Sequence, residues 1–106
     1  MICRIWHGYT SFDNADAYEN LLKKEIFVGI DGRNIKGDKG THLLRRNLQN
    51  EVEFITIMWF DSLEAVKIFA GEQYEEAVVP EKARVLLSHF DKLSQHYEVK
   101  GGFVMQ

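Results

Sequence analysis

The chain of 106 residues has very little cysteine and proline, with one residue of each, Cys3 and Pro80. A lone cysteine excludes an intramolecular disulfide and favours a reducing compartment. No Cys or His lies at metal-ligand spacing from Cys3, which is interpreted as a small apolar side chain of a strand. No apolar run reaches the ~20 residues of a membrane-spanning helix, and the first ten residues lack the apolar stretch of a signal peptide. We therefore expect a cytoplasmic protein without a membrane partner.

The chain also lacks an excess of charge of one sign. It has 13 basic and 16 acidic residues, a net charge of −3, and no block of Lys and Arg. These features argue against a nucleic-acid partner. His42, His89 and His96 are dispersed without a paired spacing, so the sequence predicts no metal site, and no nucleophile elbow is present. The length fits one domain, residues 1–106, with a single core.

What the chain does contain is a segment, residues 51–60, that is apolar on both sides of an expected strand. Large side chains occupy both sets of alternate positions: Val52, Phe54, Met58 and Phe60 on one side, and Ile55, Ile57 and Trp59 on the other. Successive side chains of a strand point to opposite faces, so both faces here are apolar. An antiparallel sheet in a small monomer usually leaves one face in water. We therefore expect a homodimer in which a second copy covers this sheet face.

Hydrophobic periodicity and turn residues divide the chain into alternating strands and helices. The expected strands are residues 2–9, 41–48, 51–60 and 95–104. The expected helices are about 14–28 with Asp13 as N-cap, about 62–71 with Ser62 as N-cap, a short turn within 72–79, and 81–93. The glycine-rich segment 29–40 lacks Gly-Lys-Ser/Thr and a following helix, so it is a connecting loop rather than a phosphate loop. The order β-α-β-β-α(α)-β predicts an α+β, ferredoxin-like fold with a four-stranded antiparallel sheet.

Three segments carry a resemblance to a known family. They are the opening strand ICRIWHG at 2–8, the turn into a strand GDKGTHLLRR at 37–46, and ITIMWFDSLEA at 55–65, a strand ending in Trp before an acid-rich helix start. Together they are similar to the antibiotic-biosynthesis-monooxygenase-like family of the dimeric α+β barrel superfamily, over essentially the whole chain. The resemblance implies two ferredoxin-like subunits packed sheet to sheet, with a small hydrophobic or aromatic ligand.

The resemblance also narrows the activity. The superfamily includes cofactor-independent quinone-forming monooxygenases, isomerases and haem-degrading monooxygenases. In the haem-degrading branch an Asn on the first strand, a Trp ending the third and a His on a later helix carry the chemistry. Trp59 matches the Trp, but Trp6 or His7 replaces the Asn, and residues 75–79 offer no His. A cofactor-independent monooxygenase of an aromatic or polycyclic small molecule is therefore expected; the alternative is a non-catalytic dimer that binds a small ligand or is structural.

His7 is the candidate catalytic residue, because a strand imidazole titrating near neutrality can act as a general base in a cavity between sheet and helices. The other interpretation is a histidine that is hydrogen-bonded in the dimer interface or to backbone. His7 and Trp6 point to opposite faces, so only one of them can line a given cavity. Trp59 is expected either to wall an aromatic pocket or to serve as plain core.

The remaining expected ligand-binding residues are Arg4, Arg45, Phe69 and Tyr74. Arg4 lies on a strand whose two faces are both expected to be covered, so it requires an acid such as Glu53 or a bound anion. Arg45 is a second candidate for an anionic group. Phe69 and Tyr74 are expected as helix-side neighbours of the pocket, with core as the alternative.

Overall fold

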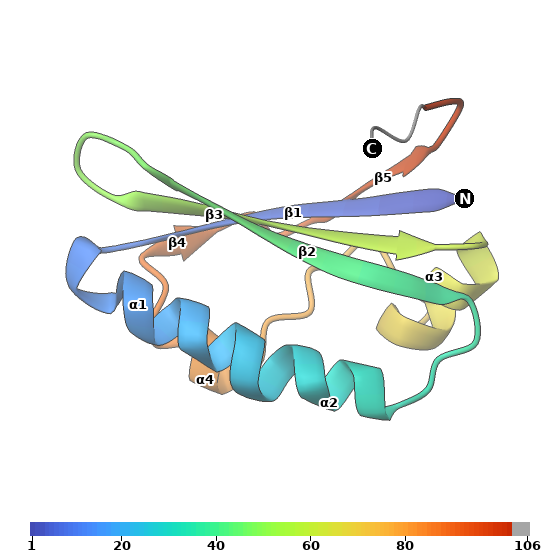
Figure 1. The fold of residues 1–106 in the computed structure, drawn as a ribbon, viewed down its shortest axis with the longest axis horizontal. Coiled ribbons are helices and arrows are strands. Elements are labelled where there is room, and N and C mark those ends of the chain that lie inside the picture. The colour runs from blue at the N-terminus through green and yellow to red at the C-terminus, as the bar shows by residue number, and fades with distance from the viewer. Residues whose placement is uncertain (103–106) are drawn as a thin grey trace.

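The computed structural model describes residues 1–102 as one antiparallel sheet with all helices on one side (Figure 1). The strands are β1 (Ile2–Thr10), β2 (Asp38–Asn47), β3 (Val52–Phe60), β4 (His89–Phe90) and β5 (Gln95–Glu98). The helices are α1 (Phe12–Leu21), the π-helix η1 (Leu22–Ile26), α2 (Phe27–Gly32), α3 (Leu63–Ala70) and α4 (Glu81–Arg84). The predicted α+β, ferredoxin-like class is confirmed.

The sheet is built around β1 and β3, which pair along their whole length with Ile5 opposite Ile57. Strand β2 pairs with the outer edge of β3. The far edge of β1 is shared by two short strands: β4 pairs near Gly8 and Tyr9, and β5 pairs along residues 2–5. The closing strand expected at 95–104 is shorter than predicted, because β5 ends at Glu98, and β4 lies in a segment expected to be helical. Residues 103 and 104 lie outside the described residues.

The two faces of the sheet have different cover. Toward the helices, β3 presents Val52, Phe54 and Phe60, which have no exposed surface. They pack with buried side chains of the helices: Ala15, Tyr18, Leu22, Ala65, Val66, Phe69 and Ala83. Within residues 1–102, no helix covers the opposite face of β1 and β3 (Figure 1). We call this the bare face; its central residues are Ile5, Ile55, Ile57 and Trp59, all partly exposed.

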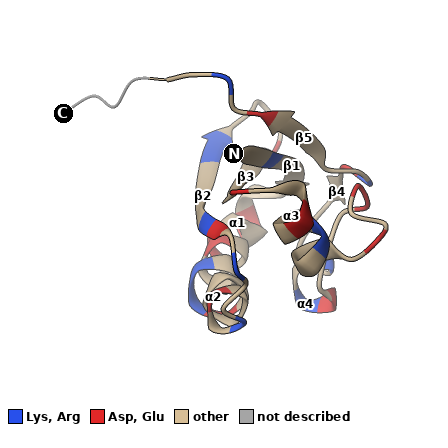
Figure 2. Ribbon diagram, turned by 90° about the vertical axis from the view of Figure 1, so that its right-hand side faces the viewer, with Lys and Arg blue, Asp and Glu red and all other residues tan. Residues whose placement is uncertain are grey.

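The first helical run begins earlier and ends later than the periodicity predicts. Ser11, not Asp13, is the N-cap: its Oγ accepts the backbone N–H of Asn14 at 3.1 Å. The run continues without a break through α1, η1 and α2 to Gly32, so part of the expected glycine-rich loop is helical. Charged residues of both signs lie along it (Figure 2), as suits an outer surface. In residues 1–102, no helix has the length and apolar character needed to cross a membrane.

The expected helix over residues 81–93 is wrong beyond Arg84. Its apolar stripe suggested helical spacing, but the backbone of 86–91 follows β1 instead. The Thr10 hydroxyl donates to the Leu86 carbonyl at 2.5 Å, and the Asp91 N–H donates to the His7 carbonyl at 3.0 Å. Residues 72–79 form turns and irregular backbone rather than a helical turn. Hydrogen bonds to the edge of β1 replace those that a longer helix would have made.

Candidate ligand cavity

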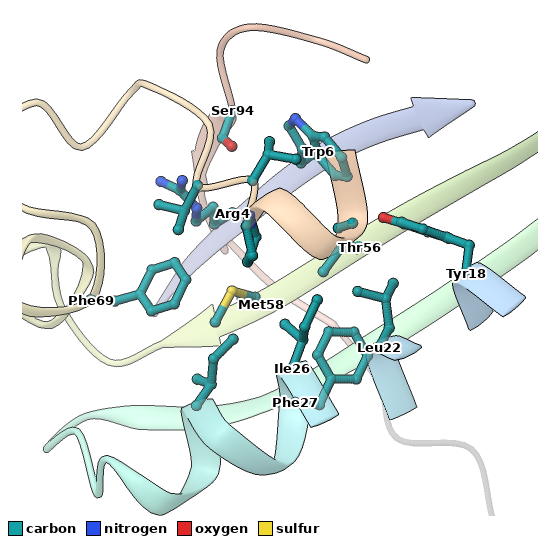
Figure 3. Close-up of a pocket in the computed structure, with 15 residues that line it drawn as sticks. Arg4, Trp6, Tyr18, Leu22, Ile26, Phe27, Thr56, Met58, Phe69 and Ser94 are labelled. Atoms are coloured by element: carbon teal, nitrogen blue, oxygen red, sulfur yellow. The ribbon is translucent and has the colours of Figure 1, made fainter. Parts of the chain in front are cut away.

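A cavity of about 60 Å³ lies between the helix-covered face of the sheet and the helices (Figure 3). Most of the side chains around it are apolar. The lining comprises Arg4, Trp6, Tyr18, Leu22, Ile26, Phe27, Ile30, Thr56, Met58, Phe69, Val78, Val79, Pro80, Ala83 and Ser94. This space holds only a few water molecules, whereas pockets for small organic ligands span roughly 300–1,000 Å³. An aromatic ligand therefore enters only if part of the wall moves.

The helical wall of the cavity is formed where the first helical run widens into the π-turn η1. There the N–H of Phe27 bonds to the carbonyl of Leu22, five residues back. Leu22, Ile26, Phe27 and Ile30 from η1 and α2 all line the cavity (Figure 3). Single π-turns within α-helices are frequent at functional sites. The local irregularity therefore coincides with the candidate site.

Arg4 brings a positive charge into this apolar surrounding, with 4% of its surface exposed. Its Nη1 donates to the Tyr74 carbonyl at 2.5 Å and to His96 Nε2 at 2.9 Å, and its Nη2 donates to the Glu76 carbonyl at 3.1 Å. The guanidinium carbon lies 5.4 Å from the centre of the Phe69 ring. Burial lowers the pKa of Arg4 to about 10, because desolvation disfavours the charged form.

The expected pairing of Arg4 with Glu53 is wrong, because the two residues lie on opposite faces of the sheet. Glu53 stands opposite Tyr9 in the register of β1 and β3, on the bare face. There its Oε1 accepts from Arg46 Nη2 at 2.9 Å and its Oε2 accepts from the Tyr9 hydroxyl at 3.3 Å. Arg4 was predicted to need an acid, but it bonds to two carbonyls and a histidine ring instead.

Phe69 and Tyr74 both lie close to Arg4, but only Phe69 lines the cavity. The contribution of Tyr74 to Arg4 is its backbone carbonyl. Its ring packs edge-on against His96, with 5.2 Å between ring centres. The same surroundings lower the pKa of His96, through desolvation first and the charge of Arg4 second. Because the guanidinium only donates, His96 accepts with a neutral ring.

His7 and Trp59 lie on the bare face, away from the cavity lining. The expected position of His7 in a cavity between sheet and helices is therefore wrong, whereas the aromatic pocket expected at Trp59 stays a prediction. The Nδ1 atom of His7 is 3.3 Å from Oδ2 of Asp91, and Trp59 Nε1 donates to His42 Nδ1 at 3.0 Å. Alternation along β1 puts Trp6 in the cavity instead. Its Nε1 donates to the Asp91 carbonyl at 2.7 Å. The role of His7 as a base stays a prediction that no contact here tests.

Arg45 also lies outside the cavity lining. Its Nη1 bonds to Asp16 Oδ1 at 2.8 Å and to Glu19 Oε1 at 3.0 Å, and its guanidinium covers the ring of Phe54. Hydrogen bonds from Arg45, and then from Lys23, lower the pKa of Glu19. These contacts tie β2 to α1, and the binding of an anionic group by Arg45 stays a prediction.

Several lining residues were missed by the sequence reasoning. Trp6 and Thr56 share a face with Arg4 and Met58, and strand alternation alone would have grouped them. Tyr18 lies on the apolar stripe of the first helix, which indicated a core residue. Burial raises the pKa of its hydroxyl. Ser94, between β4 and β5, had no sequence signal. In residues 1–102, no three His, Cys, Asp or Glu side chains gather as metal ligands.

Comparison with known proteins identifies a solved structure with a similar fold. No protein-family model matches the chain, and no curated protein sequence matches it. Among solved structures, the crystal structure of a Bacillus cereus protein, named as a candidate antibiotic biosynthesis monooxygenase, superposes with a TM-score of 0.67. The match covers 98% of this chain and 97% of that one at 12% sequence identity. The two chains therefore share one fold from end to end, as the resemblance of the sequence implied.

Proposed function

We propose that this chain is a small cofactor-independent monooxygenase-like protein that acts on an aromatic or polycyclic small molecule in the cavity under the helices. The observation that carries the proposal is the cavity itself, which has aromatic walls from Trp6, Phe27 and Phe69. The fold shared with the Bacillus cereus candidate antibiotic biosynthesis monooxygenase supports the reaction class. Fold alone does not determine function, so the cavity has to provide the chemistry.

The reaction class is the conversion of a phenol to a quinone. One phenol with a free ring position and one O₂ give one quinone and one water, and the four electrons that reduce O₂ come from the phenol. No external reductant is needed for this balance. The chain's part is to hold the ring against Trp6 and Phe69 and to exclude bulk water around it.

Ligand entry requires the wall segment formed by Val78, Val79 and Pro80 to move outward. This segment has no regular hydrogen-bonded structure, and Val78 is half exposed. Segments with few backbone ladder bonds open at low free-energy cost. The wall opposite consists of continuous helix, so we assign the opening to residues 78–80.

We further propose that the chain works in the cytoplasm as a homodimer joined through the bare face. Ile5, Ile55, Ile57 and Trp59 form a contiguous apolar strip there in the register of β1 and β3. An apolar patch that the chain itself leaves partly exposed is typical of an interaction surface. A second copy presents the same strip, so the two can pack around a two-fold axis.

Oxygen uptake with a panel of phenolic polycycles tests the proposed activity. We expect uptake that is lost in Ile30→Trp, because the larger side chain fills the cavity. Val28→Trp is the matched control: it lies on the same helix, outside the cavity, with 60% of Val28 exposed. Equal uptake by the two variants would contradict the cavity as the reaction site. Loss of uptake in His7→Ala would instead place the chemistry on the bare face.

A non-catalytic ligand-binding protein is the second candidate. It is supported by the lining of the cavity, which among the described residues includes no imidazole and no carboxylate that could act as a base. Calorimetric binding of the same phenols without any oxygen uptake would favour this candidate.

A further inference from the structure

Arg4 is a buried cation whose hydrogen-bond partners among residues 1–102 are all neutral. Its three hydrogen bonds go to the carbonyls of Tyr74 and Glu76 and to the ring of His96. The two arginines of β2 are different: Arg45 pairs with Asp16 and Glu19, and Arg46 pairs with Glu53. Within residues 1–102, no carboxylate lies within ion-pair distance of Arg4.

An uncompensated buried charge is costly, and buried charges in proteins are usually paired with an opposite charge. Carbonyl oxygens satisfy hydrogen bonds but do not neutralise the cation. The lowered pKa of Arg4, to about 10, reports the same desolvation. The site therefore has a positive charge that a bound anion would stabilise.

The proposed dimer does not supply this anion. A partner that packs on the bare face meets Ile5 and Ile57, whereas Arg4 points to the other side of β1, toward the helices (Figure 3). The guanidinium lines the cavity there, beside Phe69. The missing negative charge therefore belongs to whatever enters the cavity.

We propose that the cavity selects planar aromatic molecules with one anionic oxygen group, a phenolate or a carboxylate, which pairs with the guanidinium of Arg4. This inference rests on the cavity being the ligand site of the proposed function. Bonds to the described residues 1–102 use three of the five N–H groups of Arg4, which leaves two for the ligand oxygen. The ring of the ligand would pack against Trp6 and Phe69.

The same pairing bears on the proposed oxidation. A phenolate gives up an electron to O₂ more readily than a phenol, and a nearby cation favours the ionised form of the phenol. The phenolate and O₂ then give the quinone and a hydroxide ion, whose hydrogen comes from the ring C–H bond, and this hydroxide takes up the proton released by the phenol. The net reaction therefore leaves no proton on a side chain of the cavity.

The test uses two probes of equal shape, 2-naphthoate and its neutral analogue 2-naphthamide, titrated calorimetrically into the full chain. We expect naphthoate to bind at least about tenfold more tightly, as for a charge-assisted hydrogen bond in an apolar site. In Arg4→Met the ratio of the two affinities should fall to about one. In Arg45→Met, the matched control, the ratio should stay as in the native chain.

Each outcome decides a different point. Equal binding of both probes to the native chain would overturn the anion inference and leave the cavity as an apolar ligand site. Binding of neither probe would overturn the inference and the cavity proposal together. If Arg4→Met does not fold, the comparison in the native chain still decides the question. Arg4→Lys then adds a variant in which the charge, and with it the preference for naphthoate, should be retained in part.

Discussion

The two faces of the sheet are made by the same strands and have similar apolar composition, but only one is covered within the chain. On the helix-covered face Val52, Phe54 and Phe60 are fully buried. On the bare face Leu44 is 46% exposed and Tyr97 is 55% exposed. The comparison shows that apolar character does not distinguish a core from an interface here. The position of the helices makes that distinction.

The largest expected effect is on the covered face. Phe54→Ala removes a fully buried ring that packs edge-on against Tyr18, with 4.9 Å between ring centres. We expect the free energy of unfolding to fall by about 3–5 kcal/mol, measured by urea denaturation. Phe12→Ala, at a half-exposed position of α1, is the matched control and should cost much less. A loss below about 1 kcal/mol in the free energy of unfolding of Phe54→Ala would contradict the covered face as the core of the protein.

The second prediction tests the bare face. Ile57→Glu places a charge in the middle of the apolar strip, so it should prevent association, because a buried unpaired carboxylate is strongly disfavoured. We expect the dissociation constant of the proposed dimer to rise at least about 100-fold, while circular dichroism stays native because the covered face is untouched. Val28→Glu, on the outer surface of α2, should leave the mass in solution unchanged.

The fold could be predicted from the sequence because the strongest sequence patterns coincide with β3 and the helix α3 that follows it. The segment 51–60, apolar on both sides, and the cap at Ser62 match β3 and α3, where Ser62 Oγ accepts the N–H of Ala65 at 3.2 Å. The prediction failed over residues 85–93, whose apolar positions fit a helix equally well. Backbone pairing with β1 decides that region, with Phe90 and His89 on opposite faces, and such long-range bonds leave no local signal.

The candidate site was predictable only in part, for a related reason. Arg4 and Phe69 were named, and both line the cavity. His7 was predicted to lie in the cavity but lies on the bare face, together with Trp59, which was predicted to wall an aromatic pocket or to be core. Strand alternation separates Trp6 from His7 and Met58 from Trp59, but when both sets are apolar it does not say which set meets the helices. Which face the helices cover depends on the side of the sheet on which the connections between strands run.

A smaller effect is expected where the covering helices begin. Ser11→Ala removes the N-cap of α1 and should lower the free energy of unfolding by about 1 kcal/mol. Asp13→Ala, in the first turn, loses only a favourable interaction with the helix dipole and should cost about 0.5 kcal/mol or less. Thermal denaturation of both variants measures the difference. A larger loss of stability in Asp13→Ala than in Ser11→Ala would identify Asp13 as the N-cap.

The smallest expected effect is a pH dependence on the covered face. The pKa of His96 lies below its ordinary value of 6.5, because of desolvation and then the charge of Arg4, with Glu75 acting in the opposite direction. The unfolded chain therefore binds the proton more readily, and stability present above pH 6.5 should be lost as the pH falls through the lower folded-state pKa. In His96→Gln this part of the urea-denaturation profile should flatten. A stability that rises on acidification from pH 6.5 would reverse the assigned sign.

The most direct test of the account is the mass of the native chain in solution, measured by light scattering at micromolar concentration. With one copy at 12.3 kDa, two copies joined through the bare face give about 24.6 kDa, and we predict this value. A single species of 12.3 kDa at that concentration, with Ile57 and Trp59 open to water, would contradict the difference drawn between the two faces.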